Sequence, residues 1–132
     1  MIGLVLVSHS PEIAKGTAEL VQQMAAGDLE ISAVGGDADG FLGTDSDRIR
    51  AAIEGLDVDE VLVFMDIGSA VLSTETVFEM LEPEVAKKVR LVDAPFVEGA
   101  FAAGVSASAG AGLEECVQQA MEARTELKLH NE

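Results

Sequence analysis

The sequence feature that most constrains the fold is a regular alternation of strand-length apolar runs with helical patterns. Apolar runs suitable for strands occur at residues 2–7, 30–34, 60–65 and 88–93. Between and after them, apolar residues recur at helical spacing. This alternation is typical of α/β domains with a parallel sheet. We therefore predict a single three-layer α/β/α domain over residues 1–132, with a mainly parallel sheet of four to five strands.

The connections between these elements predict the strand order. Crossovers between parallel strands are almost always right-handed, and helices are expected on both faces of the sheet. These rules favour the order 2-1-3-4, in which the first and third strands are neighbours. His9, which follows the first strand, and Asp66, which follows the third, should then lie side by side at the carboxyl edge of the sheet.

Capping residues predict where the first two helices begin. Ser10 is a suitable N-cap, and Pro11 suits the first helical position because its missing N–H has no partner there. Thr44 or Asp45 is expected to cap the second helix, after a glycine-rich loop at residues 35–44. The loop therefore separates the second strand from the second helix.

Apolar spacing predicts which helix faces are buried. For the first helix the predicted inner stripe is Ile13, Thr17, Leu20, Val21 and Met24. Met80 and Met121 are expected to fill the core. A turn at residues 94–99 should precede a helix at 100–109, and residues 128–132 should form a frayed tail.

The composition excludes several classes of partner and compartment. The chain has 24 acidic and 8 basic residues, a formal net charge of −16, so nucleic acid and anionic membranes are poor partners. Two interpretations of this charge stay open: adaptation to a high-salt (halophile) cytoplasm, or an ordinary acidic protein. No apolar run reaches the length of a membrane span, no basic segment precedes the first run, and Cys116 is the single cysteine. We therefore expect a cytoplasmic protein without disulfides.

His9 is the leading candidate for chemistry. A neutral imidazole is a nucleophile near pH 7, and only one of its two nitrogens attacks. A carboxylate that accepts a hydrogen bond from the other nitrogen selects the tautomer and stabilises the positive ring that forms on attack. Asp66 is placed for this role by the predicted strand order.

Helix starts near this histidine are predicted to bind a phosphoryl group. Gly68 and Ser69 offer backbone N–H groups and a hydroxyl at the third helix, and Gly43 and Thr44 offer the same at the second. These groups suit a dianionic phosphoryl group, whose transfer needs mainly positioning and electrostatic stabilisation. We include Ser10 among the predicted phosphoryl-binding residues.

Structural interpretations of the same residues stay open. His9 can serve only as a hydrogen-bonding residue, and Asp66 only as a helix cap. Ser69 and Ser73 suit caps as well as phosphate ligands, and the glycines of residues 35–43 suit a surface loop. Two other α/β interpretations fail, because the first strand is followed neither by the acidic pair of an aspartyl-phosphate receiver nor by the glycine-rich turn of a dinucleotide site.

Five stretches together resemble the DhaM family, at residues 7–10, 43–45, 65–73, 75–76 and 94–99. DhaM is the phosphoryl-donor subunit of the phosphoenolpyruvate-dependent dihydroxyacetone kinase, and its first domain is a mannose-type EIIA domain of the phosphotransferase system. Sugar-transport EIIA domains of the same fold tend to carry Thr-His-Gly where this chain has Ser-His-Ser, and a Gly-Gly-Ser-Pro turn where it has Gly-Ser-Ala.

The resemblance implies a specific relay. His9 would accept a phosphoryl group from the phosphohistidine of HPr and pass it to ADP, held with magnesium on the DhaL subunit, and DhaL–ATP would phosphorylate dihydroxyacetone bound to DhaK. It also implies that Asp66 orients the histidine and that the chain forms a homodimer. No cofactor or metal ion is expected on this chain, because the phosphoryl group travels covalently. Some family members continue into HPr-like and enzyme-I-like domains, and this chain is expected to use separate carriers.

Two alternative functions stay open at this point. One is a sugar-transport EIIA domain with the same histidine chemistry and a membrane permease as the acceptor. The other is a regulatory module whose phosphorylation on His9 is read by a transcription regulator. All three functions use the same histidine, so they differ in the partner that receives or reads the phosphoryl group.

Overall fold

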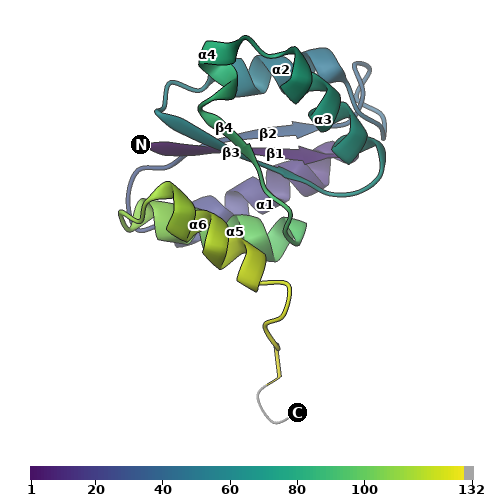
Figure 1. Cartoon of the computed structure of the whole chain (residues 1–132). Helices are drawn as coiled ribbons and strands as arrows, with labels where there is room; N and C mark the ends of the chain where they lie inside the picture. The colour runs from purple at the N-terminus through teal and green to yellow at the C-terminus, as the bar shows by residue number, and fades with distance from the viewer. Residues whose placement is uncertain (130–132) are drawn as a thin grey trace.

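Four parallel strands form the middle layer of the structure, a computed structural model that describes residues 1–129 (Figure 1). The strands are β1 (Ile2–Ser8), β2 (Glu30–Gly35), β3 (Glu60–Met65) and β4 (Val89–Leu91). Their order is β2-β1-β3-β4 and every pair is parallel, which confirms the predicted fold class and strand order. Residues 130–132 of the predicted tail lie outside the described residues.

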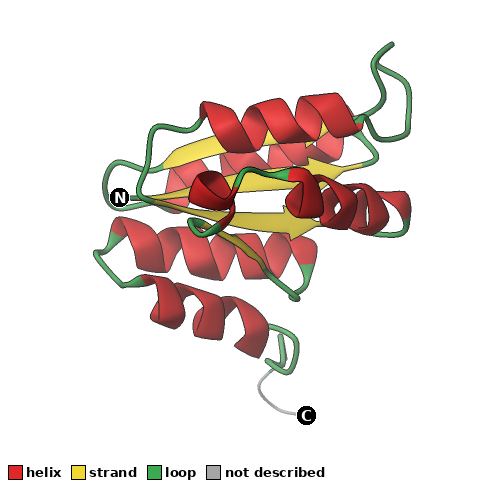
Figure 2. Ribbon diagram, turned by 45° about the horizontal axis from the view of Figure 1, so that its top comes forward, coloured by secondary structure: helices red, strands yellow, loops and turns green. Residues whose placement is uncertain are grey.

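Helices cover both faces of the sheet (Figure 2). The helices are α1 (Pro11–Met24), α2 (Ser46–Gly55), α3 (Ser69–Met80), α4 (Pro83–Ala86), α5 (Phe96–Ser108) and α6 (Leu113–Glu122). Figure 1 shows α2, α3 and α4 on one face and α1, α5 and α6 on the other. No helix within residues 1–129 has both the length and the apolar character needed to cross a membrane.

The central strand β1 is buried on both of its faces. Leu4 and Leu6 pack in the cluster that includes α1, α5 and α6, whereas Val5 and Val7 pack in the cluster that includes α2 and α3. Full burial of such a side chain stabilises the fold by about 1.5–3 kcal/mol. A continuous apolar strand is therefore held firmly in the middle layer, and its carboxyl end, where His9 follows, has a well-defined position.

The predicted helix starts are confirmed for α1 and α2. Ser10 is the N-cap of α1, where its side chain accepts a hydrogen bond from the N–H of Ile13, and Pro11 occupies the first turn. Asp45 is the N-cap of α2 and accepts from the N–H of Asp47. Each cap satisfies an N–H group that has no partner within its own helix.

Some predicted boundaries are wrong. The turn expected at residues 94–99 is shorter, because α5 already begins at Phe96 with Pro95 as its N-cap. The N–H of Gly99 donates to the carbonyl of Pro95 at 2.8 Å and closes the first helical turn. Strand β4 is three residues long rather than the six of the predicted run 88–93, and the four-residue helix α4 is too short to give a periodic signal.

The buried face of α1 also differs from the predicted stripe. Three of its members are exposed: Ile13, Leu20 and Met24. The buried side chains are smaller: Ala14, Thr17 and Val21. Close approach of α1 to the glycine- and alanine-rich face of α5 accounts for this, since large side chains do not fit between closely packed helices. Met80 and Met121 are exposed as well and do not fill the core.

The α1–α5 contact gives a stability prediction at Gly104. A Cβ added there would lie 2.3 Å from Cγ1 of the buried Val21. We expect Gly104→Ala to lower the free energy of unfolding by about 1–3 kcal/mol through overpacking. The control is Gly16→Ala on the exposed face of α1, where a Cβ meets nothing within 4 Å and should stabilise by about 0.5–1 kcal/mol. Urea unfolding measures both, and a more stable Gly104→Ala variant would contradict the packing.

Candidate functional site

The ends of β1 and β3 bring His9 and Asp66 together. The two strands are paired through Val7 and Met65, and the N–H of Asp66 donates to the carbonyl of Val7 at 3.0 Å. Nδ1 of His9 lies 3.1 Å from Oδ1 of Asp66. The predicted juxtaposition of these side chains is thus confirmed, although the residues are 57 positions apart in the sequence.

The carboxylate of Asp66 accepts four hydrogen bonds. Oδ1 receives the N–H of Ile67 at 2.6 Å and the Nδ1–H of His9 at 3.1 Å. Oδ2 receives the hydroxyl of Ser8 at 2.7 Å and the backbone N–H of His9 at 3.1 Å. Partial burial acts to raise the pKa of Asp66, but these hydrogen bonds outweigh it and lower the pKa. The group is therefore a charged acceptor at neutral pH.

This acceptor selects the tautomer of His9. An ionised carboxylate cannot donate, so Nδ1 carries the proton and the lone pair lies on Nε2. Nε2 is 2.8 Å from Oγ of Ser69, which can donate its hydroxyl proton to that lone pair. The side chain of His9 is 29% exposed. The nitrogen with nucleophilic character is thus Nε2, on the ring edge away from the carboxylate.

The start of α3 lies beside the imidazole. Gly68 is the N-cap with φ +52°, a conformation that favours glycine, and a Cβ placed there would lie 4.0 Å from Cε1 of His9. No side chain caps this helix, and within residues 1–129 the N–H groups of Gly68 and Ser69 donate to no acceptor. Free N–H groups and the helix dipole make this end of α3 attractive to an anion.

Arg48 of α2 organises the loop that covers the other side of the site. Its Nη1 lies 2.9 Å from the carbonyl oxygen of Gly35, 3.3 Å from that of Gly36 and 3.2 Å from that of Asp37. Farther along the loop, the N–H of Gly43 donates to the carbonyl of His9 at 3.0 Å. The guanidinium group therefore supports the loop that in turn supports the backbone of the histidine.

The other predicted site residues take different places. Thr44 reaches the site, since its Oγ1 lies 3.3 Å from Oγ of Ser69. The N–H of Gly43 donates to the carbonyl oxygen of His9. Ser10 caps α1 with its oxygen and donates its N–H to Oγ of Ser8 at 3.0 Å, which leaves its hydroxyl proton available. The phosphoryl-binding roles assigned to these residues stay predictions.

Sequence reasoning missed two supporting residues. The side chain of Ser8 is buried and connects Asp66 to the backbone of Ser10. Its signal is a polar residue at the end of an otherwise apolar strand. Arg48 is the other, and its signal is weaker, because an arginine in a helix usually faces solvent. Carbonyl groups that it contacts leave no trace in the sequence.

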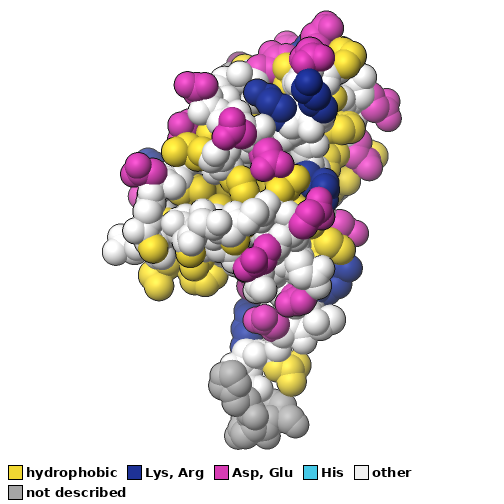
Figure 3. Space-filling view, turned by 60° about the vertical axis from the view of Figure 1, so that its left-hand side comes forward, with side chains coloured by type: hydrophobic (Ala, Val, Ile, Leu, Met, Phe, Trp, Pro, Cys, Tyr) yellow, Lys and Arg dark blue, Asp and Glu magenta, His cyan; other side chains and the backbone are white. Residues whose placement is uncertain are grey.

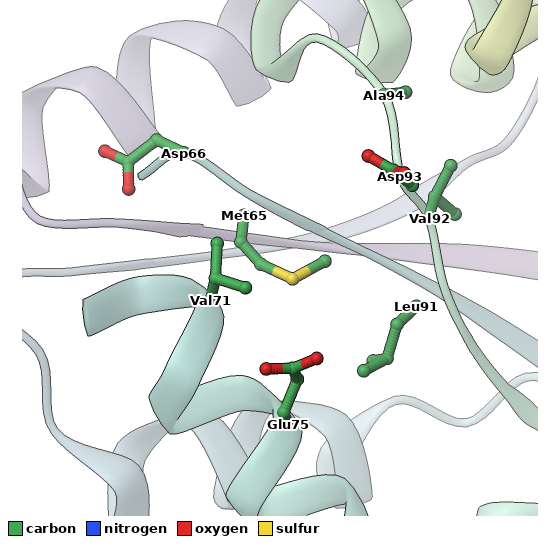
Figure 4. A pocket seen from close by; sticks show the side chains of 8 residues that line it. All are labelled: Met65, Asp66, Val71, Glu75, Leu91, Val92, Asp93 and Ala94. Carbon is green, nitrogen blue, oxygen red and sulfur yellow. The ribbon is translucent and has the colours of Figure 1, made fainter. Parts of the chain in front are cut away.

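An open cleft of about 450 Å³ borders the site between the ends of β3 and β4 (Figure 4). The carboxylate of Glu75 points into it beside Met65 and Leu91, whereas Asp66 points away from it. His9 does not line this cleft. No group of three or more His, Cys, Asp or Glu side chains suited to a metal ion occurs within the described part of the chain.

The lowered pKa of Asp66 predicts a pH dependence of stability. A folded pKa below the unfolded value of about 3.9 stabilises fully above that pH, and the stabilisation is lost as the pH falls through the folded pKa. The wild type should therefore lose more stability than Asp66→Asn as the pH falls below about 4, measured by thermal unfolding of both proteins. Asp39→Asn, an exposed site with the same change of charge, is the control. Parallel curves for the wild type and Asp66→Asn would contradict the assignment.

The contacts of Arg48 predict the dynamics of the site loop. Arg48→Met removes three hydrogen bonds to backbone carbonyls, so the loop should open more often and the amide of Gly43 should exchange about tenfold faster. Hydrogen–deuterium exchange measured by NMR tests this. Arg50→Met is the control, because within the described part of the chain the guanidinium group of Arg50 makes one surface ion pair, with Glu54 at 3.1 Å, and contacts no loop carbonyl. Equal exchange in the two variants would argue against the role of Arg48.

The chain is similar to known proteins over most of its length. The family model EIIA-man, described as the PTS system fructose IIA component, matches residues 3–117. The PEP-dependent dihydroxyacetone kinase phosphoryl donor subunit DhaM of Klebsiella michiganensis is 48% identical over 127 residues, and the corresponding subunit of Escherichia coli K12 is 47% identical. These matches cover 93% of this chain but 27% of each relative, so the chain spans about a quarter of their length.

A shorter relative and two solved structures match nearly end to end. The DhaM subunit of dihydroxyacetone kinase 2 from Listeria innocua is 41% identical over 90% of this chain and 96% of its own length. The crystal structure of EF1359, a protein of unknown function, is 40% identical with a TM-score of 0.88 over 98% of both chains. The phosphotransferase component EIIA of Streptococcus agalactiae shares the fold, with a TM-score of 0.67 at 16% identity over 94% of this chain and 92% of its own. The chain belongs to the EIIA-man family of the phosphotransferase system and, within it, to the DhaM family.

Proposed function

We propose that this chain is a phosphoryl carrier that receives a phosphoryl group on Nε2 of His9 and delivers it for the phosphorylation of dihydroxyacetone. The observation that carries the proposal is the arrangement of Asp66, His9 and Ser69. Asp66 keeps the proton of the imidazole on Nδ1, so the lone pair of Nε2 lies beside the free N–H groups at the start of α3. A nucleophile, its orienting carboxylate and an anion site then meet at one point.

The transfer is two displacements at phosphorus. In the first, Nε2 attacks the phosphorus of the donor, the Nε2–P bond forms, and the bond from phosphorus to the donor nitrogen breaks with its electron pair left on the donor. In the second, a β-phosphate oxygen of ADP attacks, ATP forms, and the electron pair returns to Nε2. Asp66 stabilises the positive ring in both steps, and the N–H groups at α3 bind the phosphoryl oxygens.

The proposed partners follow from the family. The donor is an HPr-type phosphocarrier, and the acceptor is magnesium–ADP on a DhaL subunit that works with DhaK. The relatives from K. michiganensis, E. coli and L. innocua are named as phosphoryl donor subunits of dihydroxyacetone kinase, which supports this acceptor. We place the relay in the cytoplasm and the chain in a homodimer.

The surface around His9 suits contact with other proteins despite the net charge of −16. Figure 3 turns forward the left-hand side of Figure 1, where the strands begin and which is not the side of the site, and there carboxylate side chains are spread rather than gathered in one patch. The segments that build the site instead expose large apolar side chains. Phe41 and Leu42 of the loop are 72% and 77% exposed, and Ile67 and Leu72 at the start of α3 are 70% and 66% exposed. These apolar side chains offer a contact surface that does not depend on charge, in a loop that also carries Asp37 and Asp39.

Labelling from phosphoenolpyruvate tests the proposal. With enzyme I and HPr supplied, the wild type should take up the phosphoryl group and His9→Ala should not, because it lacks the nucleophile. His130→Ala, which removes the other histidine of the chain, should be labelled like the wild type. Label on the His9→Ala protein would overturn the proposal.

The acceptor is tested by discharge of the labelled protein. Adding magnesium–ADP bound to DhaL should remove the label rapidly and yield ATP. Retention of label in the presence of DhaL–ADP, with loss of label to a sugar permease, would favour a transport EIIA instead. Label that neither acceptor removes would favour a regulatory module.

A further inference from the structure

A row of hydroxyl groups leads away from the histidine into the contact between α2 and α3. Oγ of Ser69 lies 2.8 Å from Nε2 of His9, and Oγ1 of Thr44 lies 3.3 Å from Oγ of Ser69. Oγ1 of Thr44 also lies 3.2 Å from Oγ of Ser73. The row thus connects a residue one turn into α3 with the nucleophilic nitrogen.

Local geometry explains why these three hydroxyls meet. Ser69 and Ser73 are four residues apart on α3 and therefore lie on the same face of the helix, one turn apart. Thr44 directly precedes Asp45, the N-cap of α2, at the end of the glycine-rich loop. Packing of α2 on α3 places the threonine between the two serines.

Counting protons gives the row a direction. Each hydroxyl has one proton to donate and lone pairs that accept. Because Nδ1 donates to Asp66, Nε2 accepts, and the proton of Ser69 is used there. Thr44 then donates to Ser69. The single proton of Thr44 is thereby used, so Ser73 donates to Thr44. All three hydroxyls point their protons toward the histidine.

We propose that Ser73 is a positioning residue that acts through Thr44 to hold the Ser69 hydroxyl against Nε2 of His9. The contact of Ser69 with Nε2 has the length of a strong hydroxyl hydrogen bond, whereas the two contacts of Thr44 are longer and adjustable. Two hydroxyls behind Ser69 restrict its oxygen while leaving its proton free to turn. Ser73 itself does not touch the imidazole.

The consequence for transfer rests on the proposed function. When the Nε2–P bond forms, Nε2 no longer accepts a hydrogen bond, and the proton of Ser69 is released to donate to a phosphoryl oxygen. Thr44 and Ser73 keep the Ser69 oxygen in place during this exchange. A correctly held donor contributes in the transition state, so loss of Ser73 should slow the transfer step rather than weaken the binding of the donor protein.

Nitrogen NMR of the unphosphorylated protein tests the hydrogen-bonded row directly. In protein labelled with ¹⁵N, the Nε2 resonance of His9 should move toward the value of an unbonded ring nitrogen in Ser73→Ala and in Thr44→Val, which is isosteric. Ser73→Thr and Thr44→Ser keep the hydroxyl and should restore the wild-type resonance. The matched control is Thr76→Ala on α3, whose hydroxyl has, among residues 1–129, the carbonyl of Leu72 as its one partner, at 2.9 Å.

Transfer kinetics complete the test. With HPr phosphorylated by phosphoenolpyruvate and enzyme I as the donor, Ser73→Ala should lower kcat about two- to tenfold at an unchanged KM, the range expected for one hydrogen bond. An unshifted Nε2 resonance in Ser73→Ala would overturn the inference, as would an equal shift in Thr76→Ala. The NMR result does not depend on phosphorylation. Failure of His9 to accept a phosphoryl group would therefore overturn the proposed function without deciding the role of Ser73.

Discussion

The hydrogen bonds to the Asp66 carboxylate are the interaction on which the site depends. One side chain receives donors from the end of β1, from the imidazole of His9 and from the turn that leads into α3. Four donors around one carboxylate keep it charged and hold the two strand ends together. The tautomer of His9, the direction of Nε2 and the entry into α3 all follow from this one group.

The sheet supplies the precision that this interaction needs. β1 and β3 are adjacent, buried and parallel, so their carboxyl ends are held by packing on both faces rather than by loop contacts. Arg48 and Gly43 add a second support from the loop side. The backbone of His9 is therefore supported both from the sheet and from the loop.

The sequence predicts the backbone of this arrangement better than its details. Apolar runs and crossover rules give the strand order, and with it the meeting of His9 and Asp66, because both depend on local patterns. The buried face of α1 and the start of α5 escape prediction, since they depend on how closely two small-residue helices approach. Arg48 escapes for a similar reason, because it binds carbonyl groups that every residue has.

The N-cap of α3 has a further consequence for the energetics of the carrier. A glycine N-cap costs a helix only a few tenths of a kcal/mol relative to Ser, Thr, Asp or Asn, but Gly68 supplies no side-chain acceptor to the first N–H groups of α3. A phosphoryl group on Nε2 would accept from the same N–H groups and so act as the missing cap. The loaded protein would then hold its first helical turn more tightly than the empty one. A partner that reads the rigidity of this turn can thereby distinguish the two forms without contacting the phosphorus.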